Sequence, residues 1–220
     1  MTPWLTNGLA DPRRIELSPA IVWLLYQEAR YKTSSNRTAK GRAEVIPDLR
    51  DTILNTWRTN NRVTVFLVEH LPAGLWAAAV PGAPRRTIRM IAGHLHNARC
   101  MWIKTLGQIQ GVPVPRSVDR RRVGRRELVP ALQRSSRGIL HLLTLGCEQG
   151  GSIAAPSTYT WRNLPLDVGH VLGYFVAHEA HHRGQIVVVA RALGYRLPPA
   201  ITGGLWQWTK RAAEARSQPR

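Results

Sequence analysis

Cysteine, acidic residues and long apolar runs are all scarce in this chain of 220 residues. The two cysteines, Cys100 and Cys147, lack the spacing of a redox or zinc motif, so no disulfide framework is expected. No apolar run is long enough to span a bilayer, and the N-terminus lacks the basic and apolar regions of a secretory signal. We therefore expect a soluble, cytoplasmic protein with no membrane partner.

The shortage of acidic residues leaves a large positive charge, because 13 Asp and Glu face 31 Lys and Arg. Many of the arginines cluster in one stretch: Arg116, Arg120, Arg121, Arg122, Arg125, Arg126, Arg134 and Arg137. Such a cluster is typical of a nucleic-acid-binding surface. It is equally typical of a solvated loop and helix face, and no aromatic residue interleaves with it to stack on bases. Nucleic-acid binding is therefore the less favoured interpretation.

Strands are not expected, because runs that alternate apolar and polar residues are absent. Helical spacing of apolar residues instead predicts four long helices, over residues 48–70, 87–106, 127–147 and 168–193. A short C-terminal helix is predicted over residues 205–215, with Trp206 and Trp208 as packing anchors. Pro130 fits the third long helix only if it lies in the first turn.

These helices predict an all-α fold, a four-helix bundle over residues 47–215 followed by a tail at 216–220. Residues 1–46 differ from the rest of the chain. Ser18-Pro19 can cap a short helix reaching about Tyr31, but the residues that follow it show no periodicity. This N-terminal extension is expected to be either disordered or a short helix.

The last long helix carries two histidines on its buried face. Its apolar stripe includes Phe175 and Ile186, and His178 and His182 occupy two positions of that stripe. Because they stand four residues apart, their rings project from one face, about one turn from each other. Two imidazoles so placed can reach one metal ion. The alternative is a pair of core histidines satisfied by hydrogen bonds.

The helix predicted at residues 87–106 offers a third ligand. His94 lies at the edge of the buried stripe of this helix and is the better candidate for a metal ligand. His96 does not share a helix face with His94 and is expected to be exposed or to face a partner. Three histidines leave a coordination position open for water, thiol or substrate, whose pKa a divalent ion lowers. Residues from the first and third long helices are also expected to line the pocket.

Glu179 follows the first histidine of the pair, and three roles remain open for it: a contact with the ligands, a general base, or a salt bridge with Arg183. Residues 178–182 also match the H-E-x-x-H motif of zinc peptidases. The extended motif fails, because Gln185 and Val188 stand where it requires glycine and histidine. A peptidase is therefore not favoured.

Two segments resemble the motifs of the DinB-like family of metal-binding four-helix bundles. They are Gly93-His94-Leu95-His96-Asn97-Ala98-Arg99-Cys100-Met101-Trp102 and His178-Glu179-Ala180-His181-His182-Arg183-Gly184-Gln185-Ile186. The resemblance covers about residues 47–215, and the family is named after a DNA-damage-inducible bacterial gene. It implies an up-down-down-up bundle with a long crossover, and a divalent metal, often zinc or nickel, on His94, His178 and His182. Some relatives are transferases or isomerases that use mycothiol, bacillithiol or glutathione.

The expected function is that of a metal-dependent enzyme acting on a small-molecule substrate. Thiol S-transfer or isomerisation with a low-molecular-weight thiol as co-substrate is the first expectation, and hydrolysis is the second. The alternative is a non-catalytic, metal-stabilised bundle with a basic nucleic-acid-binding surface. A homodimer is left open.

Overall fold

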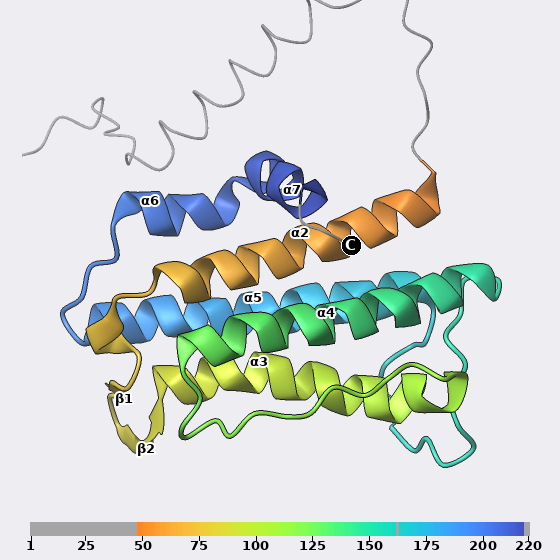
Figure 1. Ribbon diagram of the computed structural model, residues 1–220, viewed down its shortest axis with the longest axis horizontal. Helices are drawn as coiled ribbons and strands as arrows, with labels where there is room; N and C mark the ends of the chain where they lie inside the picture. The colour runs from red at the N-terminus through yellow and green to blue at the C-terminus, as the bar shows by residue number, and fades with distance from the viewer. Residues whose placement is uncertain (1–47, 162, 218–220) are drawn as a thin grey trace, which may run out of the picture. The chain divides into compact units, whose positions relative to one another are not determined.

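Four long helices dominate the structure, a computed structural model that describes residues 48–161 and 163–217 (Figure 1). They are α2 (Leu49–His70), α3 (Ile88–Trp102), α4 (Arg125–Glu148) and α5 (Val168–Ala192). The described chain is mostly helical, as predicted, and each predicted long helix is present. No described helix has the length and apolar character needed to cross a membrane. The helix predicted between Ser18 and Tyr31 lies outside the described residues.

Three of these helices begin at side chains that cap them. The carboxylates of Asp48 and Asp167 accept hydrogen bonds from the backbone N–H groups of the first turns of α2 and α5, and the Thr87 hydroxyl does the same for α3. The start predicted for α4 was wrong, because the helix begins at Arg125 after an uncapped Gly124. Pro130 therefore lies in the second turn rather than the first. The missing N–H leaves the Arg126 carbonyl without its helical donor, and both residues are exposed to water.

A short hairpin joins α2 to α3, so the expectation that the chain contains no strands was wrong. Its strands β1 (Ala79–Val80) and β2 (Ala83–Thr87) pair antiparallel around a turn in which Gly82 has a φ of 75°. The residue pattern could not reveal these strands, because they pair through their backbones and neither presents an apolar face. The hairpin makes α2 and α3 run in opposite directions.

After α3 the chain continues through a π-helical turn (Ile103–Gly107) and a 3-10 turn (Gln108–Gln110). A long connection, residues 111–124, then leads to the start of α4. It returns along α3 to the hairpin end, where the Trp76 indole donates to the Val123 carbonyl over 3.0 Å. Asn97 of α3 exchanges two hydrogen bonds with the backbone of Val118 in the connection. At the other end of the helices, the backbone N–H of Val168 donates to the Gly151 carbonyl, so α5 starts beside the end of α4.

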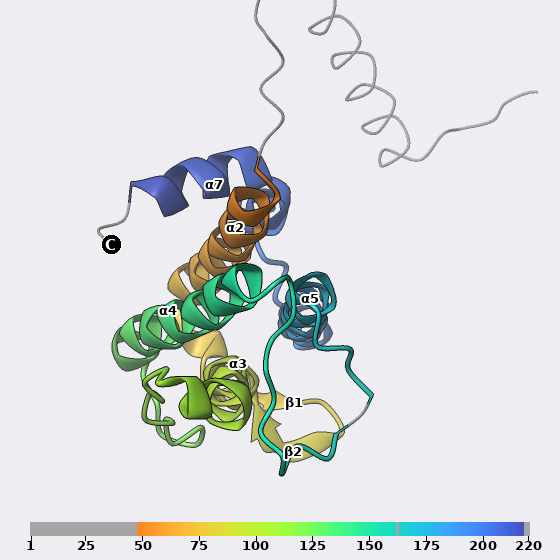
Figure 2. The same cartoon turned by 90° about the vertical axis from the view of Figure 1, so that its right-hand side faces the viewer.

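The C-terminal segment packs against α2, and its last helix crosses α2 at a steep angle (Figure 2). It comprises α6 (Pro199–Thr202), a 3-10 turn (Gly203–Trp206) and α7 (Trp208–Arg216). The prediction that Trp206 is a packing anchor was wrong, because its side chain is 79% exposed. The 3-10 turn instead brings the backbone of Gly204 against α2. A Cβ atom at this position would lie only 2.7 Å from the Phe66 ring. The anchor is Arg211, which is buried with its guanidinium 4.0 Å from the centre of that ring.

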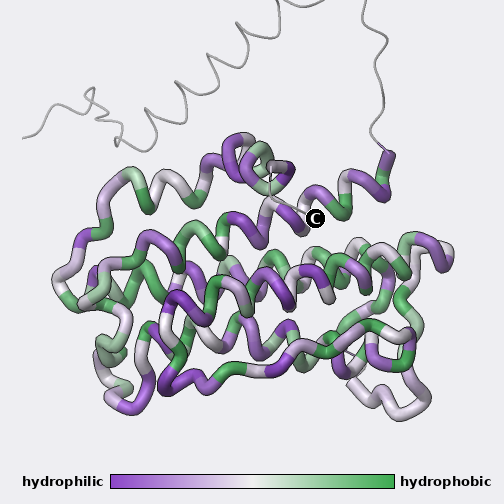
Figure 3. The backbone as a smooth tube through the Cα atoms, viewed as in Figure 1, coloured by the Kyte–Doolittle hydropathy of each residue, from purple (hydrophilic) through white to green (hydrophobic). Residues whose placement is uncertain are grey.

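Hydrophobic and hydrophilic residues alternate along the long helices (Figure 3), and the buried apolar residues form two clusters. One cluster lies near the hairpin and includes Trp76, Leu95 and Ile186. The other lies towards the opposite end and includes Trp57 and Phe175. Between them, every long helix contributes buried polar residues, which we call the polar layer: Asn60, Thr64, His96, Arg99, Ser135, Glu179 and Arg183. The two histidines of the sequence motif lie on α5 beside this layer.

Candidate metal centre

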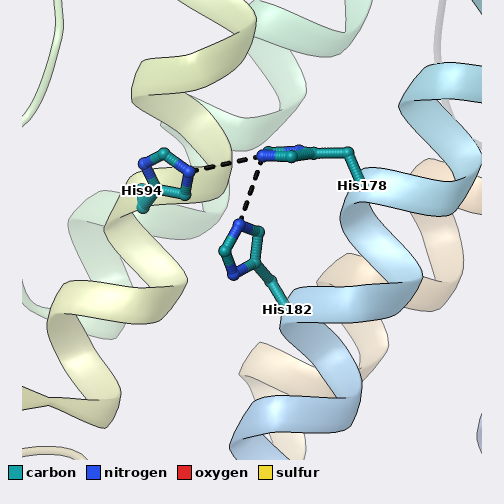
Figure 4. Close-up of side chains that lie close together, drawn as sticks. All are labelled: His94, His178 and His182. Carbon is teal, nitrogen blue, oxygen red and sulfur yellow. Dashed lines mark hydrogen bonds between the residues drawn. The ribbon is translucent and has the colours of Figure 1, made fainter.

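Three histidine side chains from two helices meet at one point (Figure 4). His94 comes from α3, and His178 and His182 come from α5. The Nε2 atom of His178 lies 3.3 Å from Nε2 of His94 and 3.2 Å from Nε2 of His182. Nitrogen ligands about 2.0–2.1 Å from one tetrahedral ion stand about 3.3 Å apart. The structure thus brings together the three residues predicted as ligands, at a spacing that suits a metal ion.

The tautomer of His182 is fixed by Gln185. His182 Nδ1 lies 2.9 Å from Gln185 Oε1, and that oxygen also accepts from the Arg86 guanidinium over 3.0 Å. Because an amide oxygen only accepts, Nδ1 carries the proton, and His182 Nε2 presents a lone pair to the other two histidines. Such a partner is typical of metal-binding histidines. The neighbouring His181 is exposed, lies outside the cluster, and contacts the amide nitrogen of Gln185.

The contacts within the cluster suit a cation better than three neutral rings alone. His182 Nε2 can only accept, so His178 Nε2 would have to donate to it. That single N–H would then also have to serve His94 Nε2, which lies 3.3 Å away. A divalent ion would satisfy the three lone pairs together. The donor set therefore fits a metal such as zinc or nickel, which imidazole nitrogens bind well.

The environment also keeps the three rings neutral. Burial lowers the pKa of each histidine, and that of His94 falls to about 4. The positive charges of neighbouring side chains add to the effect on His94, among them those of Arg120 and Arg86. At pH 7 the rings are therefore neutral, each with one nitrogen lone pair free to bind a metal.

Glu179 lies in the polar layer and is only 1% exposed. One carboxylate oxygen accepts from Arg99 Nε over 2.6 Å, and the other accepts from Asn60 and Thr64 over 2.9 and 2.7 Å. Arg183 NH1 stands 3.6 Å from the second oxygen. Burial alone would raise the pKa of this carboxyl, but Arg99 and Arg183 hold the pKa below its usual value. Of the three predicted roles, the structure contains the salt bridge with Arg183, together with a shorter one to Arg99 that the sequence did not reveal.

The prediction for His96 was wrong, because this side chain is completely buried. Its Nε2 donates to the Arg116 carbonyl over 3.0 Å, and its Nδ1 lies 3.0 Å from the Ser135 hydroxyl. Helical spacing correctly predicted that the side chains of His96 and His94 point in different directions. It could not show that α4 and the 111–124 connection cover that side of α3. His96 is thus a hydrogen-bonded core residue.

The histidine cluster opens into a cleft of about 590 Å³. Its lining comes from the hairpin, α3, the 111–124 connection and α5: Ala83, Pro84, Arg85, Arg86, Met90, His94, Arg120 and His182. The expectation that the first and third long helices contribute was wrong, because α2 and α4 supply no residue to this cleft. A volume of this size suits a small molecule.

Replacing Gln185 should weaken metal binding without removing a ligand. In Gln185→Leu the ring of His182 loses the acceptor that fixes its tautomer, and we expect the affinity for zinc to fall by about 10- to 100-fold. Competition with a chromophoric chelator measures this affinity. Gln207→Leu is a matched control, because Gln207 is exposed and its side chain makes no hydrogen bond with a described residue. Equal affinities in the two variants would refute the positioning role of Gln185.

The comparison with protein families accords with this site. A family model described as the DinB family matches residues 36–216, which include all three histidines and the helices α2 to α7. Comparison with curated proteins and with solved structures found no match. Because the family model spans most of the sequence, the chain belongs to the DinB family.

Proposed function

We propose that this DinB-family protein is a metal-dependent enzyme that acts on a small molecule. His94, His178 and His182 would hold a divalent ion, with zinc or nickel as the candidates. The observation that carries the proposal is the convergence of three neutral imidazoles, two of which, those of His94 and His182, line an open cleft. We also propose the up-down-down-up topology, which is supported by α2 and α5 running towards the hairpin end while α3 and α4 run away from it (Figure 1).

The reaction proposed first is thiol S-transfer or isomerisation, with a low-molecular-weight thiol as co-substrate. A divalent ion at this site would supply Lewis-acid chemistry and lower the pKa of a thiol. Within the chain, Gln185 orients His182, and the cleft walls hold the substrate beside the histidines. Hydrolysis of a small molecule is the second proposed reaction, and it would use the same three residues.

Glu179 is proposed as a positioning residue rather than a general base. Its two oxygens are already engaged by Arg99, Asn60 and Thr64, and it does not line the cleft. Through these bonds it ties α5 to α2 and α3, directly after the ligand His178. A base needs an oxygen within reach of the substrate's proton, and this carboxylate offers none towards the cleft.

A nucleic-acid-binding bundle is the second candidate function, and one observation favours it. Arg116, Arg120, Arg121 and Arg122 are all exposed on the 111–124 connection. Binding through these side chains would weaken steeply as the salt concentration rises. DNA or RNA binding that is absent, or insensitive to salt, would remove this candidate.

Cobalt substitution tests the thiol reaction. The cobalt-substituted protein is expected to change its visible and near-ultraviolet spectrum when mycothiol, bacillithiol or glutathione is added, because a thiolate is a good ligand for such an ion. The same titration of His178→Ala, carried out with equal cobalt, should show no protein-specific change. An unaltered wild-type spectrum with every thiol would contradict thiol chemistry and make hydrolysis the reaction to test.

A further inference from the structure

Three arginines surround the open side of the histidine cluster. Arg85 and Arg86 belong to β2, and Arg120 belongs to the 111–124 connection, so segments far apart in the sequence supply them. All three are exposed and line the same cleft as His94 and His182. Their convergence is a property of the fold rather than of the arginine-rich stretch, because two of the three lie outside that stretch.

These three arginines differ in their ion pairing from other arginines of the described chain. Within the described part of the chain, no carboxylate forms an ion pair with Arg85, Arg86 or Arg120. Asp119, the acidic neighbour of Arg120, instead accepts from the Arg121 backbone and pairs with Arg122. Arginines elsewhere behave differently, and Arg62, for example, pairs with two glutamates. The cleft therefore presents a surplus of positive charge, which favours an anionic occupant.

Arg120 is held close to the candidate ligands. A Cβ atom at Gly93 would lie only 3.3 Å from Arg120 Cγ, so the stem of this arginine packs on α3 directly before His94. Arg86 is tied to the cluster from the other side, because it donates to Gln185, which in turn holds His182. A guanidinium carries five N–H donors, so Arg86 keeps donors free for a ligand while it makes this bond.

The remainder of the cleft wall is apolar. Met90, Ala83 and Pro84 lie among the charged residues. A ligand that used the whole cleft would therefore combine an anionic group with an apolar body. We infer that the substrate of the proposed enzyme is such a molecule, a small apolar carboxylate or phosphate ester, and that Arg85, Arg86 and Arg120 bind its anionic group. This inference rests on the proposed function for the identity of the cleft as the substrate site.

The test measures the binding of simple probes to the purified full-length protein by isothermal titration calorimetry. The probes are 3-phenylpropionate, phenyl phosphate and the neutral amide of the first. We expect at least one anion to bind about tenfold more tightly than the amide, since a charge-assisted hydrogen bond distinguishes them. The anion that binds more tightly identifies the substrate class as a carboxylate or a phosphate ester.

Variants then locate the binding site. Arg120→Gln and Arg85→Gln should each weaken binding of the preferred anion about tenfold. Arg116→Gln removes the same charge from the same connection but lies outside the cleft, and it should bind as the wild type does. The wild-type protein stripped of metal with a chelator should still bind the anion more tightly than the amide, so failure of the metal proposal and failure of this inference are distinguishable.

Two results would overturn the inference. The first is an amide that binds as tightly as both anions. The second is a loss of affinity in Arg116→Gln equal to that in Arg120→Gln, which would indicate a diffuse basic surface of the kind that binds nucleic acid.

Discussion

The His178→Ala variant is expected to lose the bound divalent ion. His178 is the central member of the cluster, with Nε2 atoms of the other two histidines at 3.2 and 3.3 Å. Loss of a ligand should cost more than the roughly 10- to 100-fold expected when a ligand only loses its hydrogen-bond partner. The affinity for zinc or nickel should therefore fall by more than about 100-fold. Elemental analysis after dialysis against the metal measures the stoichiometry directly.

His181→Ala is the matched control for this experiment. His181 is also a histidine of α5, but it is exposed and lies outside the cluster. Its replacement should leave the metal stoichiometry of the wild type unchanged. The alternative derived from the sequence, a pair of core histidines satisfied by hydrogen bonds, predicts little bound metal in any variant. Wild-type metal content in His178→Ala, or negligible metal in the wild type, would refute the three-histidine centre.

The Glu179→Gln variant is expected to lose about 3–5 kcal/mol of its free energy of unfolding. The substitution preserves the size of the side chain but removes the negative charge between Arg99 and Arg183, which are 1% and 7% exposed. Two buried guanidinium groups would then lack a counter-ion. Chemical denaturation monitored by circular dichroism gives the free energy, and extrapolation to zero denaturant allows the variants to be compared.

Glu148→Gln provides the comparison for a surface pair. Glu148 pairs with Arg50 over 2.7 Å, but about half of each side chain is exposed, so its replacement should cost less than about 1 kcal/mol. In the double variant Glu179→Gln with Arg99→Met, the total loss should be smaller than the sum of the two single losses. A Glu179→Gln protein as stable as the wild type would contradict the role of this carboxylate in holding α5 to α2 and α3.

The spacing of residues within each helix was enough to predict which histidines could serve as ligands. The four-residue interval between His178 and His182 places both rings on one face, and the buried stripe of the second long helix singled out His94. Capping residues such as Asp48 and Asp167 likewise located helix starts to within a residue. These features could be predicted because they depend on residues that lie close together in the sequence.

Features that depend on how the helices dock could not be predicted in the same way. The hydrogen bond between Arg99 and Glu179 joins two helices, and the residue spacing within neither helix predicts it. The link from Arg86 through Gln185 to His182 requires the hairpin, which has no strand-like pattern. His96 was misjudged for the same reason, because the segments that bury it lie elsewhere in the sequence.

The polar layer also constrains how the helices can align along the bundle axis. Apolar burial on both sides of it is non-directional and by itself specifies axial alignment only through side-chain shape. The pairing of Glu179 with Arg99 adds a stricter requirement, because a slip of one turn, about 5.4 Å, would bury their charges apart from each other. A slip of that size exceeds the 3.3 Å between His94 and His178, so it would also separate the candidate ligands. The buried ion pair thus favours the single axial register in which α3 and α5 present their histidines at the same height.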